Sequence, residues 1–217
     1  MADRDIDPQA VTDLLGALAY GELTAFERLA VDATLAPTLA DEAALGAMAV
    51  AEYGHFVRLR DFLRARGAEP DGAMAPFVAA LDGFHEQTAP ADWLEGLVKA
   101  YVGDGIAADF YREVSAYVDA DTRALVQEVL ADTGHAAFAV EHVRAAILAE
   151  PAVAGRLALW ARRLVGEALT QAQRVMVERE ALADLIADGT DLREVVRLLT
   201  RITDAHGARM EALGLSS

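Results

Sequence analysis

Two short motifs in the sequence combine a carboxylate with an imidazole at the same spacing. Glu52 precedes His55 by three residues, Asp132 precedes His135 by three, and the two copies lie 80 residues apart. In both copies an alanine stands before the acid and a glycine before the histidine. Residues three apart on an α-helix project from nearly the same face, so each copy can offer two ligands to one metal ion. The repetition predicts two such pairs of ligands facing each other around a pair of metal ions.

Two further acids extend this pattern. Glu22 lies within an apolar helical stripe, and Asp104 lies on the apolar side of another expected helix. A glycine precedes each of them, and they are 82 residues apart, close to the spacing of the two motifs. A carboxylate within an apolar stripe is costly to bury unless it is paired or bound to a metal. Glu27 and Asp109 follow five positions later. A helix turns about 140° over that distance, so we expect these two in surface or supporting salt bridges.

The elements that must position these residues are helices. Apolar residues recur at three- and four-residue steps along most of the chain, and Asp7, Gly67 and Pro151 mark starts and stops. We expect helices over about residues 8–34, 38–64, 75–84, 90–118, 119–150, 152–187 and 191–213. The long connection across residues 67–90 suits a crossover that runs the length of a bundle.

The expected architecture is an all-α protein of one domain, residues 1–217. Its core, about residues 8–150, is a four-helix bundle made of two duplicated helical hairpins joined by the long crossover. Two additional C-terminal helices over about residues 152–213 are too apolar on one side to stand alone. We therefore expect them to pack on the bundle or on another subunit.

The composition supports this architecture and excludes several kinds of site. Hydrophobic residues make up 54% of the 217 residues and aromatic residues only 6%, as in helical proteins rich in Ala and Leu. The chain has no cysteine, which excludes disulfides, thiolate metal sites and cysteine nucleophiles. Acids outnumber Lys and Arg by 35 to 19, and the net charge of −16 disfavours nucleic acid as a partner. No secretory signal or membrane-spanning run is visible, so we expect a soluble cytoplasmic protein without membrane contact.

The candidate ligands resemble those of a known superfamily. In the ferritin-like di-iron carboxylate superfamily, two helices each supply one carboxylate and two others each supply an acid-x-x-His motif. Six residues of this chain resemble that set: Glu22, Glu52, His55, Asp104, Asp132 and His135. The helix count, the extra C-terminal helices and the stretch at residues 101–111 are similar to the tRNA hydroxylase-like branch. That branch is named for a di-iron enzyme that hydroxylates a modified adenosine in tRNA.

The resemblance implies a di-iron oxidoreductase, and more specifically an oxygen-activating hydroxylase. Glu22 and Asp104 would be terminal carboxylate ligands, Glu52 and Asp132 would bridge, and the two histidines would each bind one ion. The cofactor would be two iron ions, although oxygen and nitrogen ligands also suit Mn or Zn. The partners would be dioxygen and an unidentified substrate, with tRNA implied by the resemblance alone, in a homodimer.

Two departures from the superfamily pattern keep an alternative open. Glutamate usually stands where this chain has Asp104 and Asp132. Because aspartate is one methylene shorter, we expect the ion on that side to be the more weakly bound. If both ions were lost, the chain would be a metal-free ferritin-like bundle that acts as an oligomeric or interaction module. Storage of iron in a shell is disfavoured because the additional helices would obstruct cage packing.

Three histidines lie outside this ligand set. His85 and His206 stand in polar surroundings without a partner pattern, and both are expected to be exposed. His142 lies two turns beyond His135 and follows Glu141; it could support the metal ligands, but we expect it on a helix surface.

Overall fold

The computed structural model describes residues 6–131, 135–189 and 192–216, with the backbone alone over 187–189 and 192–196. Every regular element in these ranges is helical, as the sequence predicts. The elements, in chain order, are α1 (Pro8–Asp32), η1 (Ala33–Leu35), α2 (Leu39–Ala65), α3 (Pro70–Met74), η2 (Ala75–Phe77), α4 (Val78–Gln87), α5 (Trp93–Val114), η3 (Ser115–Tyr117), α6 (Ala120–Val129), α7 (His135–Ala149), α8 (Val153–Glu178), α9 (Glu180–Gly189) and α10 (Leu192–Leu213).

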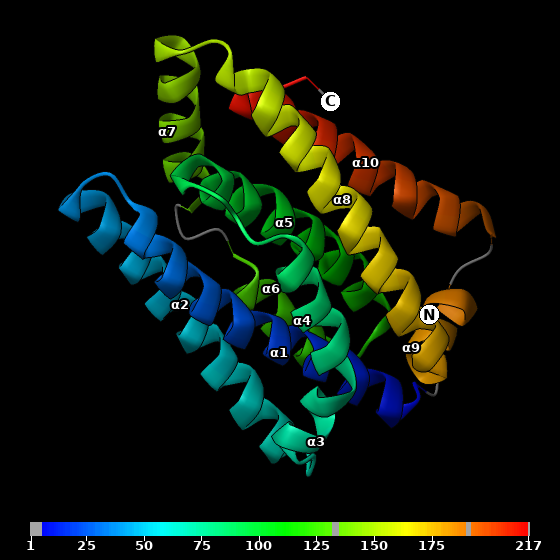
Figure 1. Cartoon of the computed structure of the whole chain (residues 1–217). Helices are drawn as coiled ribbons and strands as arrows, with labels where there is room; N and C mark the ends of the chain where they lie inside the picture. The colour runs from blue at the N-terminus through cyan, green and yellow to red at the C-terminus, as the bar shows by residue number, and fades with distance from the viewer. Residues whose placement is uncertain (1–5, 132–134, 190–191, 217) are drawn as a thin grey trace.

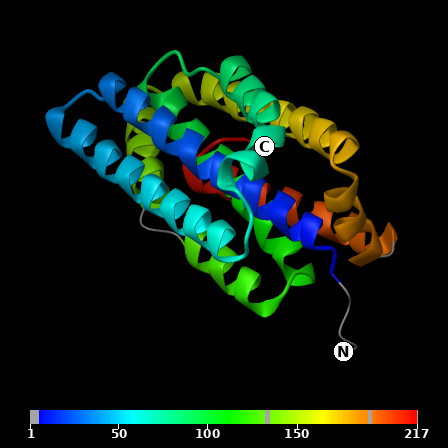
Figure 2. The same ribbon diagram turned by 90° about the horizontal axis from the view of Figure 1, so that it is seen from below.

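The helices form a bundle around α5 (Figure 1). α1 and α2 make an antiparallel hairpin, and α5 packs on α1 and α7 as well as on α8 and α10. The segment with α3 and α4 is the expected crossover, since it leads from the end of α2 to the start of α5. The view from below also places α2 and α8 on opposite sides of the molecule (Figure 2). The prediction that the C-terminal helices pack on the bundle is confirmed by the buried side chains of Leu157, Trp160 and Leu164 on α8.

Polar caps fix the starts of several helices where the sequence predicts them. The carboxylate or hydroxyl of each cap accepts a hydrogen bond from a backbone N–H two or three residues further on. The caps are Asp7 before α1, Thr38 before α2, Asp92 before α5 and Asp119 before α6. Each cap is a local signal, because it satisfies a backbone N–H of its own helix.

The expected continuous helix over residues 119–150 is wrong. α6 ends at Val129, Leu130 leaves the helical conformation with φ −85° and ψ 10°, and α7 begins at His135. The intervening sequence contains Asp, Thr and Gly, which are poor helix formers. In contrast, α2 runs unbroken through Glu52 and His55.

The expected helix over residues 152–187 is also interrupted. α8 ends at Glu178, Arg179 has φ −125° and ψ 80°, and α9 begins at Glu180. The Arg179 guanidinium donates to the buried carboxylate of Asp13 on α1, with Nε–Oδ2 at 2.9 Å. This ion pair holds Arg179 against α1. Breaking it would leave the carboxylate of Asp13 buried without a partner, which is costly.

The buried apolar residues form two clusters that follow one another along the bundle. On α1 the first cluster extends to Ala19 and the second begins at Leu29. On α2 the second cluster extends to Ala49 and the first begins at Phe56. A layer between the clusters contains three ionisable residues of the predicted site: Glu22, Glu52 and His55.

Candidate metal centre

Glu22 is the carboxylate that α1 places in the layer between the two apolar clusters. The residue is 8% exposed, so the acid within the apolar stripe of the sequence is buried as expected. Its Oε2 lies 3.3 Å from Nδ1 of His55 on the neighbouring helix. The hairpin of α1 and α2 therefore brings together two of the six predicted ligands.

Glu52 and His55 project from the same face of α2, as their three-residue spacing predicts. Glu52 Oε2 lies 3.2 Å from His55 Nδ1, and both residues are 9% exposed. With Glu22 they form a group whose potential ligand atoms all lie within 4.8 Å of one another. Within the ranges that the structure describes, this is the only such group of three or more His, Asp or Glu residues.

His135 approaches the same cluster from the other side, at the start of α7. Its Nδ1 lies 3.2 Å from Glu52 Oε1, the carboxylate oxygen that does not contact His55. The His135 side chain is 24% exposed, more than the 11% of Glu52. Glu52 thus stands between two imidazoles from different helices, with one oxygen toward each. A carboxylate in this position can bridge two ions.

The charges in the cluster are strongly coupled. Burial raises the pKa of Glu22 and the nearby Glu52 raises it further, although the bond with His55 opposes both effects. Burial also disfavours ionisation of Glu52, but hydrogen bonds with His135 and His55 outweigh it and lower the pKa of Glu52. Hydrogen bonds with Glu22 and Glu52 raise the pKa of His55 to about 9. Without a metal, the cluster therefore retains protons at Glu22 and His55 that a divalent ion would displace on binding.

The donor set fits a first-row transition metal. Neither Glu22 nor Glu52 forms an ion pair with a Lys or Arg of the described chain, and their close partners are imidazoles. A buried carboxylate without a cation is costly, so a bound cation would stabilise this arrangement. Carboxylate oxygens with imidazole nitrogens suit Fe, Mn or Zn. The residues therefore fit the metal that the sequence pattern implies.

Asp104 lies near this cluster without joining it. It projects from α5 into a neighbouring pocket and keeps exposed surface there. The negative charge of Glu52 acts on this carboxylate through space. Asp104 is thus close enough to respond to Glu52, but it is outside the group of mutually close ligand atoms. Its predicted ligand role stays a prediction.

Asp132, the sixth predicted ligand, lies outside the described residues. The structure therefore brings four of the six predicted residues into contact, places Asp104 beside them and leaves Asp132 undescribed. The expected salt bridges of Asp109 are confirmed, because its carboxylate pairs with Arg209 at 2.6 Å and with Arg112 at 3.4 Å.

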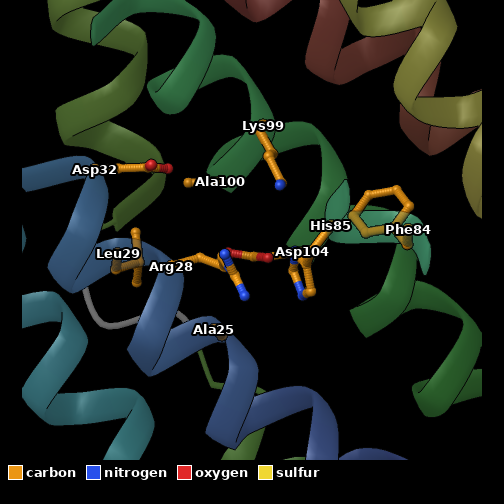
Figure 3. Close-up of a pocket in the computed structure, with 9 residues that line it drawn as sticks. All are labelled: Ala25, Arg28, Leu29, Asp32, Phe84, His85, Lys99, Ala100 and Asp104. Atoms are coloured by element: carbon orange, nitrogen blue, oxygen red, sulfur yellow. The ribbon is translucent and has the colours of Figure 1, made fainter. Parts of the chain in front are cut away.

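The pocket beside Asp104 contains a histidine that the sequence analysis placed wrongly. His85 on α4 is partly buried, its Nδ1 is enclosed, and that atom has no hydrogen-bond partner within the described chain. Figure 3 shows His85, Lys99, Arg28 and Asp104 directed toward one space. The signal for burial was present, because His85 follows the apolar Leu81 by four residues on the same helical face.

The expectations for the other two histidines also need correction. His206 on α10 is partly buried rather than exposed, and its Nδ1 is enclosed without a partner in the described part of the chain. His142 lies against α2 instead of on a free helix surface, because its Nε2 lies 2.9 Å from Asp41 Oδ1. The contact of His142 with Asp41 is tertiary, so the neighbouring sequence gave no sign of it.

None of the helices in the described part of the chain combines the length and the apolar character needed to cross a membrane. No curated protein matches the sequence. The profile of a family described as "Ferritin-like domain, actinomycetes" matches residues 6–189. Among solved structures, a protein from Synechococcus described as having aldehyde deformylating oxidase activity is similar, with a TM-score of 0.73 and 19% identity. The similarity covers 95% of this chain and 90% of that protein, and it establishes a shared fold.

Proposed function

Because the chain belongs to the family of actinomycete ferritin-like domains, we propose that it is a di-metal oxidoreductase with two iron ions as cofactor. One observation carries this proposal. The two carboxylate oxygens of Glu52 each face a different imidazole, 3.2 Å from His55 on one side and 3.2 Å from His135 on the other. This arrangement supports a bridging role for Glu52, with one histidine for each ion.

The residues divide between the two ions according to this geometry. Glu22, Glu52 and His55 would hold the first ion, and their ligand atoms are already together. Glu52 and His135 would hold the second, with the carboxylates of Asp104 and Asp132 as its predicted further ligands. Two bound iron ions supply dioxygen activation and the oxidising power to break a C–H bond.

The protein contributes an enclosed and charged setting for that chemistry. The apolar clusters on either side of the layer restrict water, which strengthens electrostatic interactions within it. His55 Nδ1 lies between Glu22 Oε2 and Glu52 Oε2, where it retains a proton in the metal-free protein. Burial by the surrounding protein raises the pKa of the Tyr111 phenol on α5. The phenol therefore keeps its proton at pH 7 and can donate a hydrogen bond.

The substrate we propose is an organic molecule whose C–H bond is oxidised, as in a hydroxylase. The similar Synechococcus protein is described by an oxidase activity on an organic substrate, which supports oxidation as the reaction class. tRNA as the substrate rests on the family resemblance alone, and the net charge of −16 opposes a polyanionic partner.

Metal stoichiometry tests this proposal. The protein should be expressed in iron-replete medium, purified without chelator and analysed for bound metal. We expect about two iron ions per chain. Glu52→Ala should remove most of the bound iron, because it deletes the ligand shared by both sites. Asp61→Ala is the matched control, since Asp61 is an exposed acid on the same helix that pairs with Arg60 and Arg64. Iron-free wild-type protein, or equal iron in the Glu52 and Asp61 variants, would refute the proposal.

A second candidate is the metal-free interaction module, and two observations favour it. Asp104 lies outside the ligand cluster, and the helix that was expected to present Asp132 with His135 is interrupted. In that case Glu52→Ala should change the free energy of unfolding without changing bound metal. The function would then lie in oligomerisation or in binding to a partner. The iron analysis above separates the two candidates directly.

A further inference from the structure

A small pocket lies beside the candidate metal centre, between α1, α4 and α5 (Figure 3). Its volume is about 30 Å³, and its walls include the charged side chains of Arg28, Asp32, Lys99 and Asp104. Lys99 is buried, whereas Arg28 is exposed, so the pocket leads from the surface toward the interior. Only Asp104 belongs to the predicted ligand set.

The two cations of this pocket have no anionic partner in contact. None of the ion pairs in the described part of the chain joins Arg28 or Lys99 to a carboxylate, although two aspartates line the same space. The Lys99 ammonium donates to the backbone oxygen of Thr88 at 2.8 Å and lies 5.5 Å from the Phe84 ring. These contacting groups are neutral, and the carboxylates of Asp32 and Asp104 act on the ammonium only through space. An anion placed between the two cations would gain charge-assisted hydrogen bonds from both.

A buried polar atom in the same pocket also lacks a partner. His85 lines the pocket, and its enclosed Nδ1 makes no hydrogen bond to any described residue. Burial lowers the pKa of His85 to about 3, and the charges of Lys99 and Arg28 contribute to the decrease. The imidazole is therefore neutral at pH 7 and carries one N–H. A ligand oxygen in the pocket would give this ring a partner and relieve the cost of burying an unpaired polar atom.

We propose that this pocket binds a carboxylate group, held by Arg28 and Lys99 with His85 as a further hydrogen-bond partner. A monoanion fits better than phosphate, because Asp32 and Asp104 also line the pocket and would repel a dianion more strongly. The volume of about 30 Å³ suits a group of this size. The side chain of Leu29 supplies an apolar wall for the carbon next to the carboxylate.

The position of Asp104 connects this pocket to the metal chemistry. If the proposed function is correct, the bound group is the carboxylate of the substrate, or of a small acid that binds beside it. A metal ion held by Asp104 would remove one negative charge from the pocket. The carboxylate should then bind more tightly to iron-loaded protein than to metal-free protein, and this second part of the inference rests on the proposed function.

The test uses metal-free protein in the presence of a chelator, so that an anion cannot bind to iron. Sodium acetate is titrated at constant ionic strength, and the imidazole resonance of His85 is followed by NMR. We expect saturable binding with a Kd on the order of 1 mM, in keeping with a ligand of a few heavy atoms. Arg28→Gln should weaken binding about tenfold, whereas Arg28→Lys retains the charge and should retain most of the affinity.

Arg58→Gln is the matched control, because Arg58 is an exposed arginine that pairs with Glu128 away from the pocket. It should bind acetate as the wild type does. No saturable shift in the wild type, equal binding by Arg28→Gln, or tighter binding of phosphate than of acetate would overturn the proposal. Hexanoate distinguishes the two sources of a carboxylate. Tighter binding of hexanoate supports the end of a longer acid, and equal binding supports a small free acid.

The two proposals can fail separately. Acetate binding by a protein that takes up no iron would leave the pocket assignment intact and refute the oxidoreductase. Iron binding without a shift of the His85 resonance in acetate would refute the pocket assignment and leave the oxidoreductase proposal intact.

Discussion

The two halves of the candidate centre start from matching sequence motifs and reach different structures. In the first half, α1 and α2 are continuous through Glu22, Glu52 and His55, whose ligand atoms form one close group. In the second half, α5 directs Asp104 into a pocket, and His135 begins α7 after a break in the expected helix. Within the described residues, the compact group therefore lies in the half whose helices continue through the ligands.

The electrostatic surroundings of the two halves also differ. In the first half, the carboxylates of Glu22 and Glu52 raise the pKa of His55 to about 9. Beside the second half, burial together with Lys99 and Arg28 lowers the pKa of His85 to about 3. The first environment attracts a cation, while the second contains cations of its own. On the proposed function, the first half would therefore bind its ion more tightly than the second, which lies beside the cationic side chains of Lys99 and Arg28.

Removal of each histidine in turn is the strongest test of this contrast. We expect His55→Ala to reduce iron affinity about 100-fold, because its ring contacts both carboxylates of the compact group. We expect His135→Ala to reduce it about tenfold, since this more exposed side chain serves the weaker half. Stepwise binding of Fe(II), measured anaerobically by calorimetry, gives both values.

His206→Ala supplies the control, because this partly buried histidine lies on α10 and belongs to neither half. Both binding steps should be unchanged in it. Equal losses in the His55 and His135 variants would show that the two halves bind metal as one symmetric unit, and the comparison would then be wrong.

The pH dependence of stability sharpens the electrostatic side of the comparison. The pKa of His85 is about 3 in the folded protein, against about 6.5 in an unfolded chain. Between about pH 6.5 and pH 3, His85 binds a proton in the unfolded state and not in the folded state. The stabilising contribution of neutral His85 is therefore complete above pH 6.5 and is lost as the pH falls toward 3. The slope from this one group is at most about 1.4 kcal/mol per pH unit.

His85→Gln should remove that slope, because glutamine is polar and does not titrate. Urea unfolding of metal-free wild type and variant at pH 7, 6 and 5 measures the difference. The variant should lose less stability than the wild type as the pH falls. Parallel pH profiles for the two proteins would mean that His85 can be protonated in the folded state, and that its pocket is less cationic than the side chains indicate.

Much of the fold could be predicted because its signals are local. The caps at Asp7, Thr38 and Asp119 lie within three residues of the N–H groups that they bind. The apolar stripes likewise identify which face each helix buries. The break between α8 and α9 could not be predicted in this way. The break at Arg179 is held by Asp13, a residue far away in sequence, and no local pattern could reveal that pair.

Part of the candidate site could be predicted for the same reason. Glu22, Glu52 and His55 were identifiable because burial of acids in an apolar stripe and i, i+3 spacing are properties of a single helix. The pocket at His85 was not, because it requires α4 to pack beside α1 and α5. A duplicated motif predicts duplicated ligands only if both copies adopt the same backbone, and α6 already ends at Val129, before the second copy begins.

The smallest expected effect concerns the support of the second half. His142 follows His135 by two turns of α7, and its two ring nitrogens each lie 2.9 Å from an acceptor, Asp41 Oδ1 and the backbone oxygen of Phe138. The ring also lies 4.1 Å from that of Phe138. These contacts fix α7 against the start of α2, so His142→Ala should weaken the second iron-binding step about threefold to tenfold and leave the first unchanged. Asp41→Asn removes the charge from the same contact and should also weaken the second iron-binding step. A weaker first binding step in these variants would mean that His142 supports both halves. The proposed difference between the two halves would then be wrong.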